Sequence, residues 1–115
     1  MKRAVLCVAL VAASGAHAYF KDGNKLLSEL KDNTGTNIFP AIGMGYITGV
    51  ADALYGITNC PPANVTAGQV TDMVRNYLDN TPAIRHLPAN QVVSHVLKSV
   101  WPCPATPSGS GGRQL

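Results

Sequence analysis

The chain has 115 residues with nine Lys or Arg against six Asp or Glu, which gives a formal net charge of +3. This length predicts a single domain. Lys2 and Arg3 supply two of the three excess positive charges, and the remaining sequence has no basic stripe and only 6% aromatic residues. We therefore expect no nucleic-acid binding.

The first 18 residues have the three-part pattern of an export signal. A basic start, Met1–Arg3, precedes an apolar run, Ala4–Ala13, and small residues at Ala16 and Ala18. We expect cleavage after Ala18; the alternative is a buried N-terminal helix. The apolar run is too short to span a bilayer, and no later run has membrane length, so we expect no membrane span.

Cleavage would remove Cys7 and leave Cys60 and Cys103. In an exported chain, such a pair most simply forms a disulfide, which here would stabilise the fold by about 4 kcal/mol on the chain-entropy model. The alternative is a metal site, which requires more Cys and His ligands at closer spacing than His86 and His95 provide. We therefore expect neither a metal nor a cofactor.

Two helices are predicted before Cys60. Residues 19–33 carry Leu26, Leu27 and Leu30 on an otherwise charged segment, which predicts a short amphipathic helix. A turn at residues 33–37 follows, and residues 38–57 have the apolar spacing of a second helix. Thr36 or Asn37 is the expected cap of that second helix.

The second predicted helix contains Gly43, Gly45 and Gly49, each of which lowers helix stability by about 1 kcal/mol. Glycine in a helix permits close approach of another backbone, so we expect this helix to cross the Cys60–Cys103 segment tightly. Asp52 is the one carboxylate here. It is either a solvated helix residue or a partly buried hydrogen-bond acceptor, and the sequence leaves both interpretations open.

The Cys60–Cys103 segment predicts a helical hairpin closed by the disulfide. Thr66 and Gln69 have the spacing of a capping box at the start of its first helix. Thr81–Pro82 predict a single turn, with the Thr hydroxyl at the cap and Pro at the first helical position. The last helix begins after Leu87–Pro88 and ends before Pro102.

Together these elements predict an all-α fold, a small domain of four to five helices over residues 19–103 with one intrachain disulfide. Residues 104–115 are rich in Pro, Gly and Ser and are expected to be disordered.

No arrangement of residues favours catalysis. Ser94 and His95 are neighbours on a predicted helix, so their side chains point about 100° apart, which does not suit a nucleophile and its base. His95 is expected at the surface or at the boundary of the core. The carboxylates occur singly, and both remaining cysteines are used in the disulfide. We expect no catalytic residue and no enzyme.

Several short motifs run through the predicted domain. They are Gly45-Tyr46 with Gly49 and Asp52, then Cys60-Pro61, Val65–Gln69, Tyr77-Leu78 with Asn80 and Pro82, and finally Trp101-Pro102-Cys103. Together, over about residues 22–103, they resemble the Rap/Tai family of type VI secretion immunity proteins. The run from Cys60 to Cys103 is the specific part of this resemblance.

The resemblance implies a small, all-helical, periplasmic protein with one intrachain disulfide, often a homodimer. It also implies a partner: a secreted peptidoglycan-cleaving amidase effector, whose active-site cleft the protein would block. The matching residues are expected to be mostly architectural. We assign that role to Gly45, Tyr46, Gly49, Asp52, Thr66 and Gln69.

An inhibitor of this kind needs a rigid, protruding segment rather than chemistry of its own. The candidates are the loop Thr81–Pro88, with Arg85 and His86 at its tip, and the loop Pro61–Asn64, with Asn64 as its candidate contact residue. For each loop the alternative is an ordinary connector.

Two other functions remain open. A periplasmic chaperone of the acid-stress (Hde) type would have more titratable groups than a chain with 13% charged residues. An accessory subunit of an envelope complex, without a toxin partner, is the other.

Overall fold

A computed structural model describes residues 19–105. The predicted export signal lies outside the described residues, as does the predicted tail beyond Ala105. The described chain contains four α-helices: α1 (Gly23–Leu30), α2 (Ile38–Leu54), α3 (Ala67–Asn80) and α4 (Ala89–Val100). A short 3-10 helix, η1 (Pro82–Ile84), connects α3 and α4. The predicted all-α class with one disulfide is confirmed.

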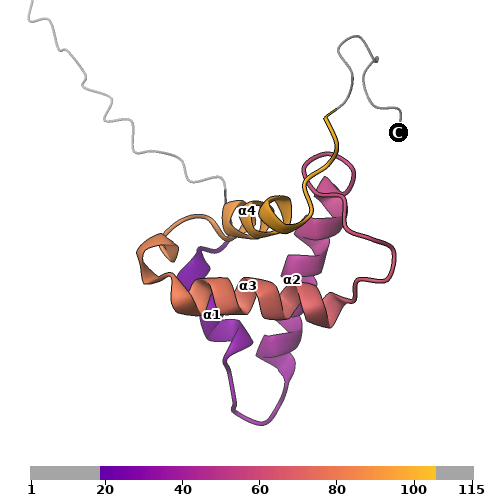
Figure 1. The fold of residues 1–115 in the computed structure, drawn as a ribbon. Helices are drawn as coiled ribbons and strands as arrows, with labels where there is room; N and C mark the ends of the chain where they lie inside the picture. The colour runs from indigo at the N-terminus through magenta and orange to yellow at the C-terminus, as the bar shows by residue number, and fades with distance from the viewer. Residues whose placement is uncertain (1–18, 106–115) are drawn as a thin grey trace, which may run out of the picture.

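The helices form two pairs (Figure 1). α3 and α4 run antiparallel as the predicted hairpin, and α2 crosses behind α3 and also contacts α4. α1 and α2 form the second pair, and the turn between them projects at the lower end of the molecule. Apolar side chains from all four helices meet in one core, whose fully buried members include Leu26, Ile47, Val74, Leu78, Val93 and Leu97.

Local capping explains where two helices start. The Asp22 side chain accepts a hydrogen bond from the Lys25 backbone N–H at 2.9 Å, so α1 begins at Gly23 and is shorter than residues 19–33. At α3 the predicted capping box is confirmed: the Gln69 N–H donates to Thr66 Oγ1 at 3.1 Å, and the Thr66 N–H donates to Gln69 Oε1 at 2.8 Å.

Two other capping predictions are right about the position of the residue but wrong about its hydrogen bond. Asn37 occupies the N-cap position of α2, but its backbone is left-handed (φ 57°) and its side chain makes no capping bond. A left-handed residue does not hold its side chain in the extended geometry that N-caps use. Thr81 likewise makes no side-chain bond to η1, although Pro82 does stand at the start of that turn.

The disulfide joins Cys60 and Cys103, with 4.8 Å between their Cα atoms. Cys103 follows α4 closely, whereas Cys60 lies within the connection between α2 and α3 rather than at a helix end. The Cys60 N–H also donates to the Trp101 carbonyl at 2.8 Å. The bridge therefore fixes the α2–α3 connection to the end of α4. No helix within residues 19–105 is long and apolar enough to cross a membrane.

Candidate partner-binding surface

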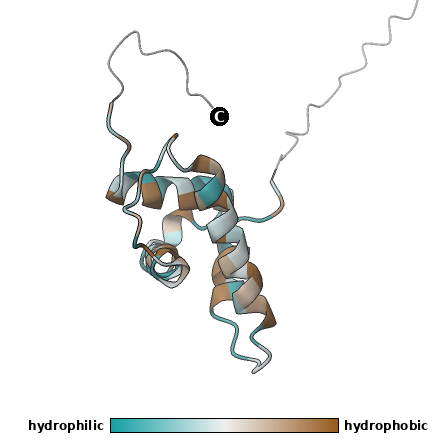
Figure 2. Ribbon diagram, turned by 90° about the vertical axis from the view of Figure 1, so that its right-hand side faces the viewer, coloured by the Kyte–Doolittle hydropathy of each residue, from teal (hydrophilic) through white to brown (hydrophobic). Residues whose placement is uncertain are grey.

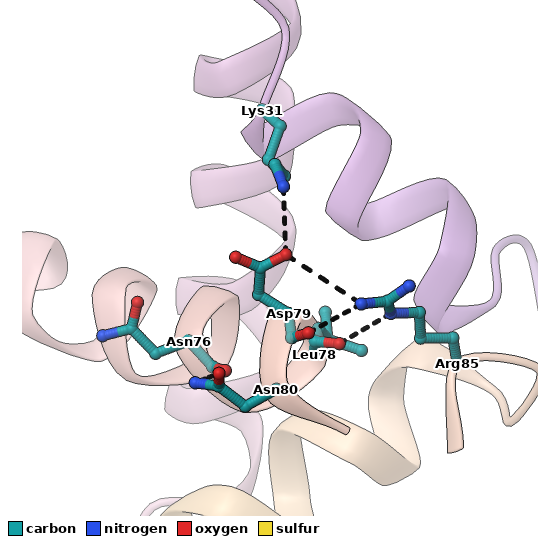
Figure 3. Close-up of polar contacts among 6 residues, drawn as sticks. All are labelled: Lys31, Asn76, Leu78, Asp79, Asn80 and Arg85. Carbon is teal, nitrogen blue, oxygen red and sulfur yellow. Dashed lines mark hydrogen bonds and ion pairs between the residues drawn. The ribbon is translucent and has the colours of Figure 1, made fainter. Parts of the chain in front are cut away.

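The Thr81–Pro88 loop is held in place by Arg85. Its guanidinium donates to the carbonyl oxygens of Leu78 and Asp79, each at 2.7 Å, and Figure 3 shows it pointing back onto the end of α3. These carbonyls belong to the last turn of α3, where no intrahelical donor is available. The Arg85 side chain, 25% exposed, thus caps a helix. His86, the other residue at the predicted tip, is exposed.

Backbone contacts tie the same loop to the segment before α1. The Asn24 N–H donates to the Arg85 carbonyl at 2.8 Å, and the Gly23 N–H donates to the Leu87 carbonyl at 3.0 Å. Gly23 is required here, because a Cβ at this position would lie 2.8 Å from Leu78 Cδ2 and 2.9 Å from the Arg85 oxygen. The loop is therefore anchored on both sides while His86 faces solvent.

A cluster of charges surrounds Asp79 at the end of α3 (Figure 3). Lys31 Nζ lies 2.9 Å from the Asp79 carboxylate, and Arg85 Nη2 lies 3.9 Å from it. The hydrogen bond and positive charge of Lys31, with smaller contributions from Arg85 and Arg75, lower the pKa of Asp79. Because the pair is exposed, it contributes little to stability.

Asn64 is exposed in the loop that precedes α3, next to the disulfide. It lies before the first residue of α3, and Arg85 and His86 lie beyond its last residue. Fourteen helical residues separate these ends, a distance of about 20 Å. The structure therefore does not bring the two predicted contact loops together into one site.

The glycines of α2 do not all behave as expected. At Gly43, α2 packs closely against another helix, because a Cβ there would lie 2.8 Å from Leu30 Cδ2. That helix is α1 rather than one of the two helices of the hairpin. At Gly45 and Gly49 a Cβ would meet nothing within 4 Å. The expected tight crossing with the hairpin is wrong at these two positions, because both glycines face outward.

Tyr46 and Asp52 complete the residues singled out on α2. Tyr46 is half-buried, and burial raises the pKa of its hydroxyl, opposed in part by a hydrogen bond with the Asn90 backbone. Asp52 is exposed, which agrees with the solvated interpretation, and its carboxylate makes no hydrogen bond or ion pair within residues 19–105.

A buried ion pair that the sequence did not reveal lies close to the ring of Tyr46. Lys21 Nζ is 2.6 Å from Glu29 Oε2, with side chains only 12% and 6% exposed, and it also lies 4.8 Å from the centre of the Tyr46 ring. The pair joins the segment before α1 to α1 and α2. Lys21 and Glu29 are eight residues apart, and Lys21 lies before the start of α1, so the pair does not have the spacing of an ion pair within one helix.

An apolar groove of about 310 Å³ lies between α3 and α4. Tyr77 and His95 line it, with their rings 5.6 Å apart and tilted by 43°, beside Ile84 and Leu87. His95 is exposed, as predicted. No group of three or more potential metal ligands occurs in residues 19–105. The described surfaces therefore offer grooves and rigid loops, which suit binding to another molecule.

Comparison with known proteins agrees with that conclusion. A search of curated proteins found no match to the chain. The family model of the Rap1a immunity proteins matches residues 22–103, which spans every helix from just before α1 to the second cysteine of the disulfide. Because this match covers well over half of the sequence, the chain belongs to the Rap1a immunity protein family, whose members are non-enzymatic inhibitors.

Proposed function

We propose that this protein is a periplasmic inhibitor of a peptidoglycan-cleaving amidase delivered by a type VI secretion system. The observation that carries the proposal is the family match over the whole helical domain. The disulfide supports it, because disulfides form in oxidising compartments such as the periplasm. The anchored Thr81–Pro88 loop and the disulfide-fixed Pro61–Asn64 loop support binding by preformed shape, which lowers the entropy cost of association.

The test uses the full chain, produced by export so that the disulfide forms, and a panel of purified type VI amidases. We expect one amidase to bind, and its release of peptidoglycan fragments to fall in proportion to added protein, reaching zero near an equimolar ratio. An inhibitor that acts by occlusion is not consumed, so it should be recovered intact. A panel in which no amidase binds or loses activity would contradict the proposal.

The two loops can be tested separately. We expect one of two variants, His86→Ala or Asn64→Ala, to weaken amidase binding about tenfold or more. The variant with this effect identifies the loop that lies at the centre of the interface. Because both side chains are exposed, neither change should alter the free energy of unfolding. Titration calorimetry measures the first effect and urea denaturation the second. Arg85→Ala is a poor probe, because it also removes the cap of α3.

If both single variants and the double variant bind with wild-type affinity, neither loop contacts the amidase.

We also propose that the protein forms a homodimer through the outward stripe of α2, defined by Ile38, Ile42, Gly45 and Gly49. At 100° per residue these four positions lie within about 60° of each other around the helix. Ile38 and Ile42 are 58% and 46% exposed, and the two glycines leave the backbone open to a second helix. Figure 2 shows hydrophobic residues on the helices that rise from the lower turn. A self-complementary stripe suits a twofold interface.

We expect Gly45→Leu to shift the protein from dimer to monomer, measured by sedimentation velocity. A Cβ at this position would have no neighbouring atom within 4 Å outside its own stretch of α2, so folding should be unimpaired. Ser28→Leu, at an exposed position of α1, is the matched control and should remain dimeric. A wild-type protein that is monomeric at high concentration, or a Gly45→Leu variant that stays dimeric, would contradict this interface.

A further inference from the structure

We propose that the groove between the end of α2 and the Cys60–Thr66 connection binds a basic side chain, arginine or lysine, of the partner protein. This inference rests on the proposed function and adds the chemistry of one contact. The groove has a volume of about 530 Å³. One wall is α2, with Thr48, Asp52 and Tyr55, and the other contains Pro61, Pro62 and Val65.

Asp52 is the only charged residue that lines this groove. The side chains of the other five Asp and Glu residues each accept a hydrogen bond from another residue, whereas the Asp52 carboxylate accepts none within residues 19–105. A carboxylate is stabilised most strongly by a charge-assisted bond to a cation. The groove therefore presents an acceptor that the described fold leaves for an external donor.

The position of Asp52 in its helix strengthens the local negative potential. It lies in the last turn of α2, which ends at Leu54, where the helix dipole and the terminal carbonyls are already negative. A carboxylate in this turn destabilises the helix, and no basic residue occupies the same turn to offset it. Across the groove, the positive end of α3 is partly neutralised, because Thr66 and Gln69 form its capping box. A cation is favoured over an anion.

The remaining walls suit the stem of a long basic side chain. Tyr55 is 57% exposed, and aromatic faces attract ammonium and guanidinium groups. Pro61, Pro62 and Val65 supply apolar surface along which the methylene groups of arginine or lysine can pack while the charged head reaches Asp52. The disulfide at Cys60 and the hydrogen bond from Gly56 N–H to the Asn59 carbonyl, 2.8 Å, fix this wall in advance.

The test is a titration of the ¹⁵N-labelled full chain with N-acetyl-arginine methylamide, followed by amide chemical shifts. The matched probe is the citrulline analogue, which has nearly the same shape but no charge. We expect arginine to shift the amides of residues 48–55 and 65–70, and citrulline to leave them unchanged. Asp52→Asn should abolish the shifts, and Asp32→Asn, in the turn between α1 and α2, should retain them.

Absence of shifts at these residues, equal shifts with citrulline, or shifts that persist in Asp52→Asn would each overturn the proposal. The arginine titration needs no amidase, so its failure is distinct from failure of the proposed function. For an amidase that binds wild type, we expect Asp52→Asn to weaken binding about tenfold.

Discussion

Replacing both Cys60 and Cys103 by serine is expected to lower the free energy of unfolding by about 4 kcal/mol. The bridge spans a sequence separation of 43, and on the chain-entropy model a loop of this length restricts the unfolded chain by about that amount. Small domains are stable by only about 5–15 kcal/mol, so a large share of the stability would be lost. Urea denaturation of the oxidised protein and the double variant measures the difference.

The reduced wild-type protein is the control for the double variant. Both lack the crosslink, so their free energies of unfolding should agree within about 1 kcal/mol. The free energy of unfolding of the oxidised wild-type protein should be higher than both. We also expect amidase binding to weaken, because only non-covalent contacts, among them the hydrogen bond from Cys60 N–H to the Trp101 carbonyl, would then hold the α2–α3 connection against the end of α4. An oxidised protein no more stable than the reduced one would show that the disulfide does not stabilise the fold.

Glu29→Gln is expected to destabilise the protein by about 3 kcal/mol. The change keeps the size of the side chain but leaves Lys21, only 12% exposed, without its counter-ion. Removing one partner of a buried pair costs about 3–5 kcal/mol, and the lower value applies because the Tyr46 ring still lies 4.8 Å from Lys21 Nζ. Thermal and urea unfolding measure the effect, and a double change, Lys21→Met with Glu29→Gln, should recover part of it.

Asp79→Asn is the matched control for this second prediction. Asp79 pairs with Lys31, but both side chains are about half exposed, so the same chemical change should have a small effect. Since the pKa of Asp79 is lowered in the folded protein, its contribution is present above the unfolded value and is lost as the pH falls through the folded value. Equal destabilisation by Glu29→Gln and Asp79→Asn would show that burial of the Lys21–Glu29 pair is unimportant.

Much of the fold could be predicted because the signals were local. The capping box at Thr66 and Gln69 uses hydrogen bonds between residues three apart, so its geometry follows from spacing alone. The apolar stripes of α3 and α4 recur at helical period, and their members Val74, Leu78 and Val93 are buried in the core. The disulfide followed from counting cysteines in a chain predicted to be exported.

The failures involve contacts between distant segments. A glycine has the same local effect whether it faces a neighbour or solvent, so the sequence could not separate Gly43, packed on Leu30, from Gly45, which faces outward. The contact of Arg85 with the end of α3 was likewise not predicted: its guanidinium reaches the carbonyls of Leu78 and Asp79, which depends on how the loop returns past α3. Its contact with a partner stays a prediction.

The candidate site was predicted less completely than the fold. Exposure of His86 and Asn64 follows from their loop positions, but their separation by the length of α3 required the structure. The groove beside Asp52 arises where the end of α2 meets the Pro61–Val65 segment, and no single stretch of sequence encodes both walls. Shape-based binding surfaces of this kind depend on tertiary arrangement more than on motifs.

The central claim is that the exported protein neutralises an amidase in the periplasm, and cell survival tests it most directly. Bacterial cells that export to their periplasm an active amidase, one that the purified protein inhibits, should lyse. Co-production of the full chain should prevent this lysis. The same chain without residues 1–18, the predicted export signal, should give no protection. Lysis at the same rate with and without the full chain, at matched levels of both proteins, would contradict the account.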